Sequence, residues 1–230
     1  MILCLETATT LCSVALCNAD GVVASRESRD LKSHASLLTV FTMEVLDEAG
    51  IKPSGLEAVA VSKGPGSYTG LRIGVSAAKG ISFGASVPLI GIETTRAMFI
   101  GMQEKTGSAR DLLFCPVLDA RRMEVYYAIY DSDGKTISEI KAEIINEESF
   151  SAIAGKKRLI IFGDGASKLK QVVKSDNVVF DEGFRMSAAH LAKPAFEALR
   201  KKEFEDVAYF EPLYLKDFIA TISKKNILGM

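Results

Sequence analysis

The sequence predicts an α/β protein made of two related lobes. Three observations lead to this prediction: short apolar strands open the chain, helices with apolar stripes alternate with further strands, and the same order restarts in the second half. With 230 residues, 48% of them hydrophobic, the chain can bury one large core or two smaller ones. We expect the first lobe at residues 1–104 and a second, reduced lobe at residues 105–230, with a C-terminal helix and an extended tail that packs back on the first lobe.

The first lobe is predicted to begin with three strands, because three apolar runs are separated by short polar turns. The segment from Asn18 to Gly21 has the composition of a hairpin turn. A helix follows, which Ser33 or Ser36 can cap and which Gly50 ends. The expected order is strand 2–6, strand 12–17, strand 22–27, helix 33–50, strand 56–62, a helix from Ser67, strand 88–92 and helix 94–104.

The second half repeats this order in shorter form. Its expected elements are strands 112–119, 124–130, 136–145 and 159–162 and a helix over 187–201, followed by a tail that is extended after Pro212. A meander of three strands followed by alternating helices and strands is typical of a ribonuclease-H-like lobe. Two such lobes form the architecture of actin, sugar kinases and Hsp70 chaperones (the ASKHA superfamily), in which nucleotide lies between the lobes. This is the fold class that we predict.

The segment Ser62–Gly80 looks like a nucleotide-binding loop, because a Gly-Pro-Gly turn leads from a strand into a helix. The spacing of its glycines does not match either of the two standard nucleotide-binding motifs. Counted from Gly64, a Walker loop and a dinucleotide fingerprint both place Thr69 where a glycine is required. The nearby Gly70 is followed by Leu71 and not by the Walker lysine. A helix N-terminus can still accept an anion. The several glycines of this helix instead favour a segment that packs very close to it.

Composition excludes several classes of protein. The net charge of −1 gives no reason to expect strong nucleic-acid binding by the chain alone, and no run of 18 apolar residues is present for a membrane span. The opening segment Met1–Leu5 lacks the basic region of a signal peptide. The cysteines contain no C-x-x-C pair and are expected to be buried thiols of a cytoplasmic protein: Cys4, Cys12, Cys17 and Cys115.

Four segments together resemble the TsaB (YeaZ) family. They occur in order across nearly the whole chain: LCLETAT at 3–9, the segment 61–80 with its specific GPGSYTGLRIG, DARRMEVY at 119–126 and EPLYL at 211–215. The resemblance implies a subunit of the bacterial machinery that makes threonylcarbamoyladenosine beside the tRNA anticodon. It implies a non-catalytic scaffold without a cofactor, which binds a TsaD-like catalytic relative, works with a TsaE-like ATPase and forms a homodimer when alone. Contact with tRNA is then expected only through the complex.

The metal site of the catalytic relative is expected to be missing. In that relative, two histidines one helical turn apart hold a metal after a segment similar to 88–93. Thr94 and Met98 stand at these positions here, and a hydroxyl with a thioether is a poor ligand set for a divalent ion. His34 and His190 lie elsewhere and have no second histidine four residues later. We therefore predict no metal site and no catalytic residues.

Three residues remain as weak candidates for binding in the cleft: Glu6, Thr9 and Asp164. Glu6 is expected to face the cleft and to hold the first hairpin through hydrogen bonds rather than to act as a base. Asp164, between two glycines, would bring a negative charge close to any phosphate, which argues against tight ATP binding. The roles of Arg121 and Arg122, in a polar turn after Asp119, and of His34 stay open: the arginines suit either a phosphate or a solvated turn with a local ion pair.

A partner-binding surface is predicted on two helices. The apolar stripe of helix 33–50 is wide, since Val40 and Met43 extend it, and one lobe needs only one face of each helix covered. With the glycine-rich helix it can form a four-helix interface with a related chain. The residues expected there are Leu38, Phe41, Val45, Tyr68, Leu71, Arg72 and Val75.

Two enzyme functions remain as alternatives. A phosphotransferase of the acetate-kinase or sugar-kinase type would need acidic metal-anchoring residues in both lobes, and only Glu6 and Asp164 are available. A glycoprotease-like metallopeptidase would need a cluster of metal ligands, which the sequence does not offer. Both alternatives are weaker than the scaffold.

Overall fold

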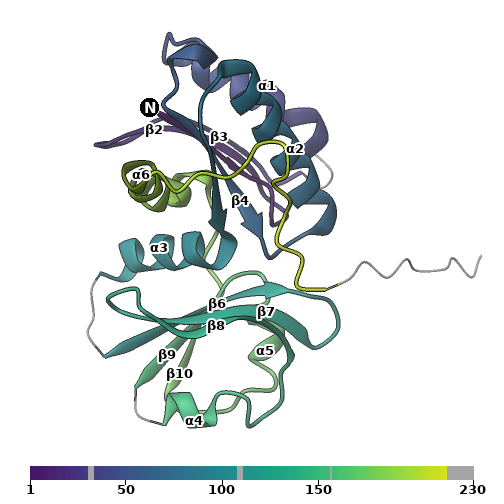
Figure 1. Ribbon diagram of the computed structural model, residues 1–230. Coiled ribbons are helices and arrows are strands. Elements are labelled where there is room, and N and C mark those ends of the chain that lie inside the picture. Colours follow the sequence, from purple (N-terminus) through teal and green to yellow (C-terminus); the bar gives the residue numbers. More distant parts are fainter. Residues whose placement is uncertain (31–33, 108–110, 156, 217–230) are drawn as a thin grey trace, which may run out of the picture.

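The computed structural model describes residues 1–30, 34–107, 111–155 and 157–216 (Figure 1). Its first sheet has the strand order β3-β2-β1-β4-β5, in which β1 to β3 form an antiparallel meander and β4 and β5 run parallel to β1. The strands alternate with helices along the chain, as the apolar runs predict. The bounds are β1 (Ile2–Glu6), β2 (Cys12–Asn18), β3 (Gly21–Ser28), β4 (Ala58–Gly64) and β5 (Leu89–Glu93).

The second sheet repeats this topology. Its order is β10-β9-β6-β7-β8, again an antiparallel meander with two parallel strands beside its first strand. The bounds are β6 (Leu112–Asp119), β7 (Glu124–Asp131), β8 (Thr136–Ile144), β9 (Arg158–Phe162) and β10 (Val178–Asp181). The two ribonuclease-H-like lobes of the predicted fold class are thus confirmed. Strand β10 was not predicted, because four half-buried residues after a polar stretch give no clear pattern.

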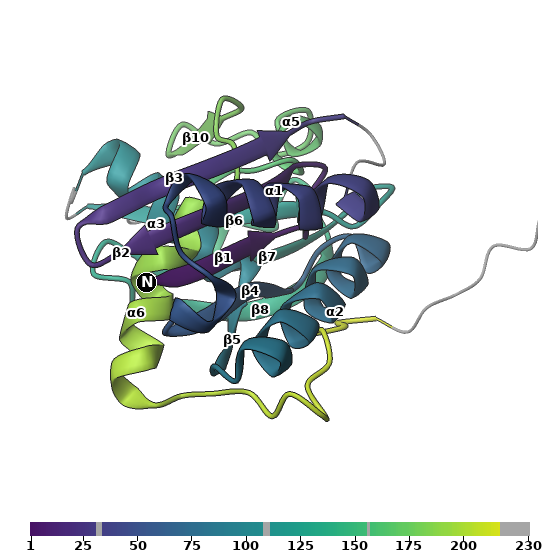
Figure 2. The same cartoon turned by 90° about the horizontal axis from the view of Figure 1, so that it is seen from above.

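Helices α1 (His34–Glu48) and α2 (Tyr68–Ala85) lie side by side on the outer face of the first sheet (Figure 2). Their buried stripes pack on apolar side chains of β1, β2 and β4. Ser36 is inside α1 rather than its cap, and Ser33 lies outside the described residues. The outer face of the second sheet is covered by short elements, α4 (Ser151–Ala154) and α5 (Ala166–Leu169).

A middle layer of helices lies between the two sheets (Figure 1). It consists of α3 (Thr94–Thr106), a 3-10 turn η2 (Ala188–Leu191) and α6 (Ala192–Lys201). Together with Cys4 and Ala60 of the first sheet and Phe114 and Phe162 of the second, these helices form one continuous core. The sequence assigned the C-terminal helix to the lobe 105–230, but α6 packs against β1, β4 and β5 of the first sheet.

The chain after α6 runs along β5 and α2 (Figure 2). The Glu205 N–H donates to Leu89 O at 2.9 Å, and the ammonium of Lys79 donates to Ala208 O at 3.1 Å and to Phe210 O at 3.0 Å. The last described part of the tail therefore covers the β5 edge of the first sheet. Among the described helices, none is long and apolar enough to cross a membrane.

Candidate functional site

The glycine helix α2 packs against the first hairpin of the chain. A Cβ atom at Gly70 would collide with the carbonyl oxygen of Thr7, and one at Gly74 would collide with the Thr7 hydroxyl. That hydroxyl donates to Gly70 O at 2.8 Å, and the Ser67 N–H donates to Ala8 O at 2.7 Å. The predicted close packing is confirmed, and the segment that approaches the helix is the chain's own hairpin turn.

Two further glycines of α2 do not share this role. A Cβ atom at Gly80 or Gly84 would meet nothing within 4 Å. The Ser67 side chain caps the helix by accepting from the Gly70 N–H at 3.3 Å. The first hairpin also packs against the turn before α2, where a Cβ atom at Gly66 would collide with Ala8 O.

The carboxylate of Glu6 is fully buried. Its Oε1 accepts from the Ala8 N–H at 2.7 Å, and its Oε2 accepts from the Ser62 hydroxyl. Burial raises the pKa of this carboxyl to about 7, with a smaller contribution from the charge of Asp164, while both hydrogen bonds oppose the rise. Glu6 was expected to face the cleft. The structure corrects this expectation. The two donors hold the Glu6 carboxylate between β1 and β4, and Glu6 does not line the cleft.

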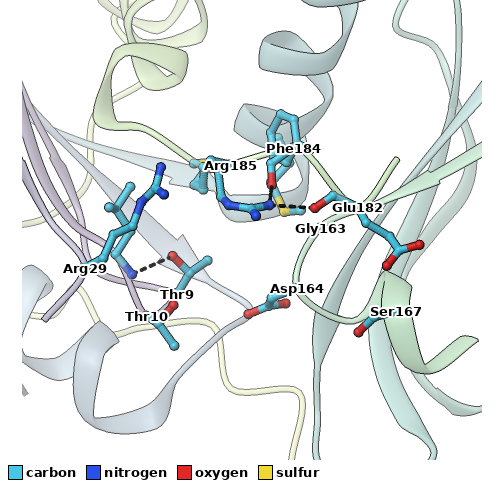
Figure 3. Close-up of a pocket in the computed structure, with 12 residues that line it drawn as sticks. Thr9, Thr10, Arg29, Gly163, Asp164, Ser167, Glu182, Phe184 and Arg185 are labelled. Carbon is cyan, nitrogen blue, oxygen red and sulfur yellow. Dashed lines mark hydrogen bonds between the residues drawn. The ribbon is translucent and has the colours of Figure 1, made fainter. Parts of the chain in front are cut away.

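A cleft of about 340 Å³ lies between the lobes (Figure 3). The β1–β2 hairpin and the end of β3 line one side, and α3, the β9–α5 turn and the segment before η2 line the other. Its side chains mix two arginines, two carboxylates, hydroxyls and an apolar wall: Thr9, Thr10, Leu11, Arg29, Met98, Gly163, Asp164, Ser167, Glu182, Phe184, Arg185 and Met186. The structure therefore brings together Thr9 and Asp164 of the three predicted cleft residues.

Asp164 has a structural partner in the cleft. Its Oδ1 accepts from the Asp119 N–H at 2.9 Å, which holds the β9–α5 turn to the end of β6. Asp164 is an exposed residue at the edge of the cleft, where surrounding protein atoms remove part of the water around its carboxylate. This desolvation, followed by the nearby charge of Asp119, raises the pKa of Asp164. The guanidinium of Arg185 also has hydrogen-bond partners in the cleft, because it donates to Glu182 O and Phe184 O at 2.7 Å each (Figure 3).

Metal-ligating side chains are not clustered in the described residues. In the part of the chain that the structure describes, no three His, Cys, Asp or Glu side chains are close enough to hold a metal ion. Thr94 and Met98 are buried. The ring of His34 lies 3.1 Å from Thr9 O, whereas His190 Nδ1 accepts from the Ser187 N–H at 3.3 Å. The two histidines therefore serve different hydrogen bonds in different elements.

The predicted partner-binding residues divide into two groups. Leu38, Val45 and Val75 are buried where α1 and α2 pack on the first sheet, and Leu71 is buried near the start of α2. This corrects the expectation that they cover a partner. Phe41 is half-buried, Arg72 is exposed, and Tyr68 is half-buried beside Tyr214 of the tail at 5.0 Å between ring centroids.

Other apolar side chains of the same two helices are open to solvent. Val40 is 46% exposed, Met43 53% and Phe83 80%. The width of the α1 stripe already indicated Val40 and Met43, whereas nothing in the sequence singled out Phe83. We call these three exposed side chains, Val40, Met43 and Phe83, the apolar outer face of α1 and α2.

The turn between β6 and β7 has an unusual backbone. Arg121 and Arg122 have positive φ angles of 69° and 48°, a conformation that disfavours residues with a side chain. Lys168 stabilises the turn by donating to Arg122 O at 2.9 Å and Glu124 O at 2.6 Å. The predicted local ion pair is formed by Asp119 with Lys168 and not with either arginine.

The sequence of this chain is similar to those of known proteins. A family model described as "TsaD: tRNA N6-adenosine threonylcarbamoyltransferase" matches residues 19–224. The "tRNA threonylcarbamoyladenosine biosynthesis protein TsaB" of Escherichia coli is 31% identical over 228 residues, which cover 95% of this chain and 96% of that protein. The protein of the same name from Bacillus subtilis is 28% identical over 94% of this chain and 93% of its own length. The chain belongs to the TsaB (YeaZ) family.

Solved structures agree with membership of the TsaB family at the level of the fold. YeaZ from Pseudomonas aeruginosa superimposes with a TM-score of 0.78 at 23% identity, over 93% of this chain and 99% of that one. A second Pseudomonas aeruginosa structure, described as having similarity to peptidase YEAZ, gives a TM-score of 0.82 at 23% identity, over 94% and 99%. The family predicted from four sequence segments is confirmed.

Proposed function

We propose that this chain is a non-catalytic subunit in the biosynthesis of threonylcarbamoyladenosine in tRNA. The relatives from Escherichia coli and Bacillus subtilis are named for that pathway and match nearly the whole chain. In this proposal the chain binds a TsaD-like catalytic relative, works with a TsaE-like ATPase, pairs with itself when alone and acts in the cytoplasm. The match of this chain to the TsaD family model supports a partner of related fold, whose similar helices can pack against α1 and α2.

One observation carries the proposal: the apolar outer face of α1 and α2. Exposed apolar side chains on two neighbouring helices mark a surface that is suited to protein contact. Phe83 alone leaves 80% of its surface in water, and Gly80 beside it leaves room for another backbone. The half-buried Phe41 borders this face.

A non-catalytic role is supported by the residues of the cleft. Asp164 and Arg185 are used in hydrogen bonds that hold the walls, and Thr94 and Met98 replace the histidines of the catalytic relative. In the described part of the chain, the cleft does not offer the cluster of metal-anchoring side chains that phosphoryl transfer or metal-dependent hydrolysis would use.

The test is co-purification of the full chain with its catalytic relative. Met43→Asp and Phe83→Asp put a charge on the outer face without disturbing the core, so we expect pairing to fall at least about tenfold while the circular dichroism spectrum is unchanged. Ile144→Asp is the matched control, because Ile144 is an exposed apolar residue, 69% exposed, on the edge strand of the other lobe. If both helix variants pair as well as the control, the interface lies elsewhere and the proposal fails. Leu71 is unsuitable for this test, since a charge at a buried position would unfold the lobe.

A further inference from the structure

Aromatic and cationic side chains are found on both lobes near the last described part of the tail. Tyr68, at the start of α2, lies against Tyr214 of the tail with an interplanar angle of 35°. The guanidinium of Arg72 is 5.5 Å from the centroid of the Tyr68 ring and donates to its hydroxyl at 3.2 Å. Tyr214 is 39% exposed and Arg72 is exposed, so a ring face and a positive charge are both accessible to solvent.

The tail connects this pair of rings to the β6–β7 turn. Two residues after Tyr214, the ammonium of Lys216 forms an ion pair with Glu124, which directly follows the turn of Arg121 and Arg122. The connection thus runs from α2 of the first lobe, through the tail, to the second lobe. We call five of these residues the stacking cluster, leaving out Lys216 because Glu124 already pairs with its charge: Tyr68, Arg72, Arg121, Arg122 and Tyr214.

The side chains of the two arginines of the turn extend into solvent. Neither guanidinium makes a hydrogen bond or an ion pair with any other residue in the described ranges, and both residues are exposed. Their left-handed backbone would suit glycine or asparagine better. Lys168 nevertheless holds the turn in place through two carbonyl oxygens. Such a turn is costly for the fold and presents two positive charges to the solvent.

We propose that the stacking cluster binds single-stranded RNA. An exposed tyrosine ring offers a face on which a base can stack, and the neighbouring cations can neutralise phosphates, which is the combination used by proteins that bind single strands. A nearly neutral chain cannot attract RNA through its overall charge, so any contact must come from a local cluster of this kind. This inference rests on the proposed function, because the substrate there is an RNA, and it assigns the chain a direct RNA contact in addition to its protein partner.

The test measures binding by fluorescence anisotropy with the full chain and a labelled oligoadenylate of about twelve nucleotides, at about 50 mM salt. We expect a Kd of about 10⁻⁴ to 10⁻⁶ M that weakens as salt is raised. Tyr214→Ala removes the accessible ring and should weaken binding about fivefold or more, whereas Tyr214→Phe keeps the ring and should bind like the wild type. The matched control is Tyr209→Ala, because Tyr209 is a tyrosine of the same tail, 84% exposed, outside the stacking cluster.

The charges are tested with a variant that spares the fold. Arg121→Gly with Arg122→Gly removes both guanidinium groups and suits the left-handed backbone, so the thermal midpoint should stay the same or rise. The slope of log Kd against log salt should fall by about 0.7 for each phosphate contact that is lost. Arg200→Ala serves as the control, because it removes an exposed arginine in the last turn of α6 and keeps the helix.

Two results would overturn this inference. One is the absence of any anisotropy change with wild-type protein at about 1 mM, which exceeds the range expected even for non-specific binding. The other is binding that is equal in wild type, Tyr214→Ala and the double glycine variant, since the RNA site would then lie elsewhere. Co-purification with the catalytic relative separates this inference from the proposed function. Loss of RNA binding with pairing retained affects only the stacking cluster, and loss of pairing with RNA binding retained affects only the interface of α1 and α2.

Discussion

At the scale of single residues, Glu6 shows how one buried carboxyl is used for structure. It sits at the carboxyl end of β1, and ligands of open α/β sheets bind outside the carboxyl ends of the strands. Here the Ala8 N–H and the Ser62 hydroxyl occupy its two oxygens, and its side chain is fully buried. The residue type was recognisable from sequence. The direction in which its side chain points could not be predicted, because one donor belongs to the next turn and the other, Ser62, lies 56 residues later in the chain.

Glu6 makes the stability of the protein depend on pH. Its carboxyl has a pKa of about 7 in the folded chain and a lower one of about 4.3 when unfolded, so the folded state binds the extra proton. This contribution to the free energy of unfolding is therefore complete below about pH 4.3 and is lost as the pH rises through 7. We expect Glu6→Gln, which stays neutral, to be more stable than wild type at pH 8 by on the order of 3 kcal/mol and nearly equal to it at pH 4.5. Urea denaturation at both pH values measures this, and an equal difference at both would contradict it.

At the scale of elements, α2 has one face packed against a backbone and one face open. Gly70 and Gly74 lie under the Thr7 carbonyl and hydroxyl, while Gly80 faces open space. The sequence showed a helix rich in glycine and hence a close approach. It could not show which glycines are in contact, because the hairpin that approaches them precedes the helix by about 60 residues in the chain.

Alanine substitutions at two positions of α2 should change stability in opposite directions. Gly70→Ala brings a methyl group into the Thr7 carbonyl, a backbone atom that cannot move away, and should lower the free energy of unfolding by about 1–3 kcal/mol. Gly80→Ala meets no atom within 4 Å and should raise it by up to about 1 kcal/mol, because alanine favours helix. Thermal or urea denaturation of the two variants measures both effects. Destabilisation by both variants to the same extent would show that α2 is not packed in this way.

At the scale of the whole molecule, the two lobes share one core. Helices α3 and α6 fill the space between the sheets, and α6 comes from the C-terminal part of the chain although it packs on the first sheet. The first lobe is therefore completed only when the chain has passed through the second. A division of the sequence at residue 104 describes the two sheets but separates α6 from the sheet it covers.

A shared core predicts that both lobes unfold together. Far-UV circular dichroism reports chiefly the helices, most of which lie on the first lobe, whereas near-UV signals report the tyrosines, three of which are in β7. The two midpoints in urea should coincide. Ala195→Asp, at a fully buried position of α6, should lower both midpoints by the same amount. Lys193→Asp, on the exposed side of α6, should change the free energy of unfolding by no more than about 0.5 kcal/mol. Two separate midpoints would contradict the shared core.

The sequence alone determined the lobes, most strands and helices and the family, because these depend on local periodicity, turn residues and motifs that lie close together in the chain. The tertiary structure decided which of these residues remain available for binding. Leu38 and Phe83 are both apolar residues on outer helices, yet one is buried under the helix and the other is 80% exposed. Likewise, only the folded tail brings Tyr214 to Tyr68 and Lys216 to Glu124. Exposure and contact between distant segments are properties of the packed chain, and no pattern within one segment specifies them.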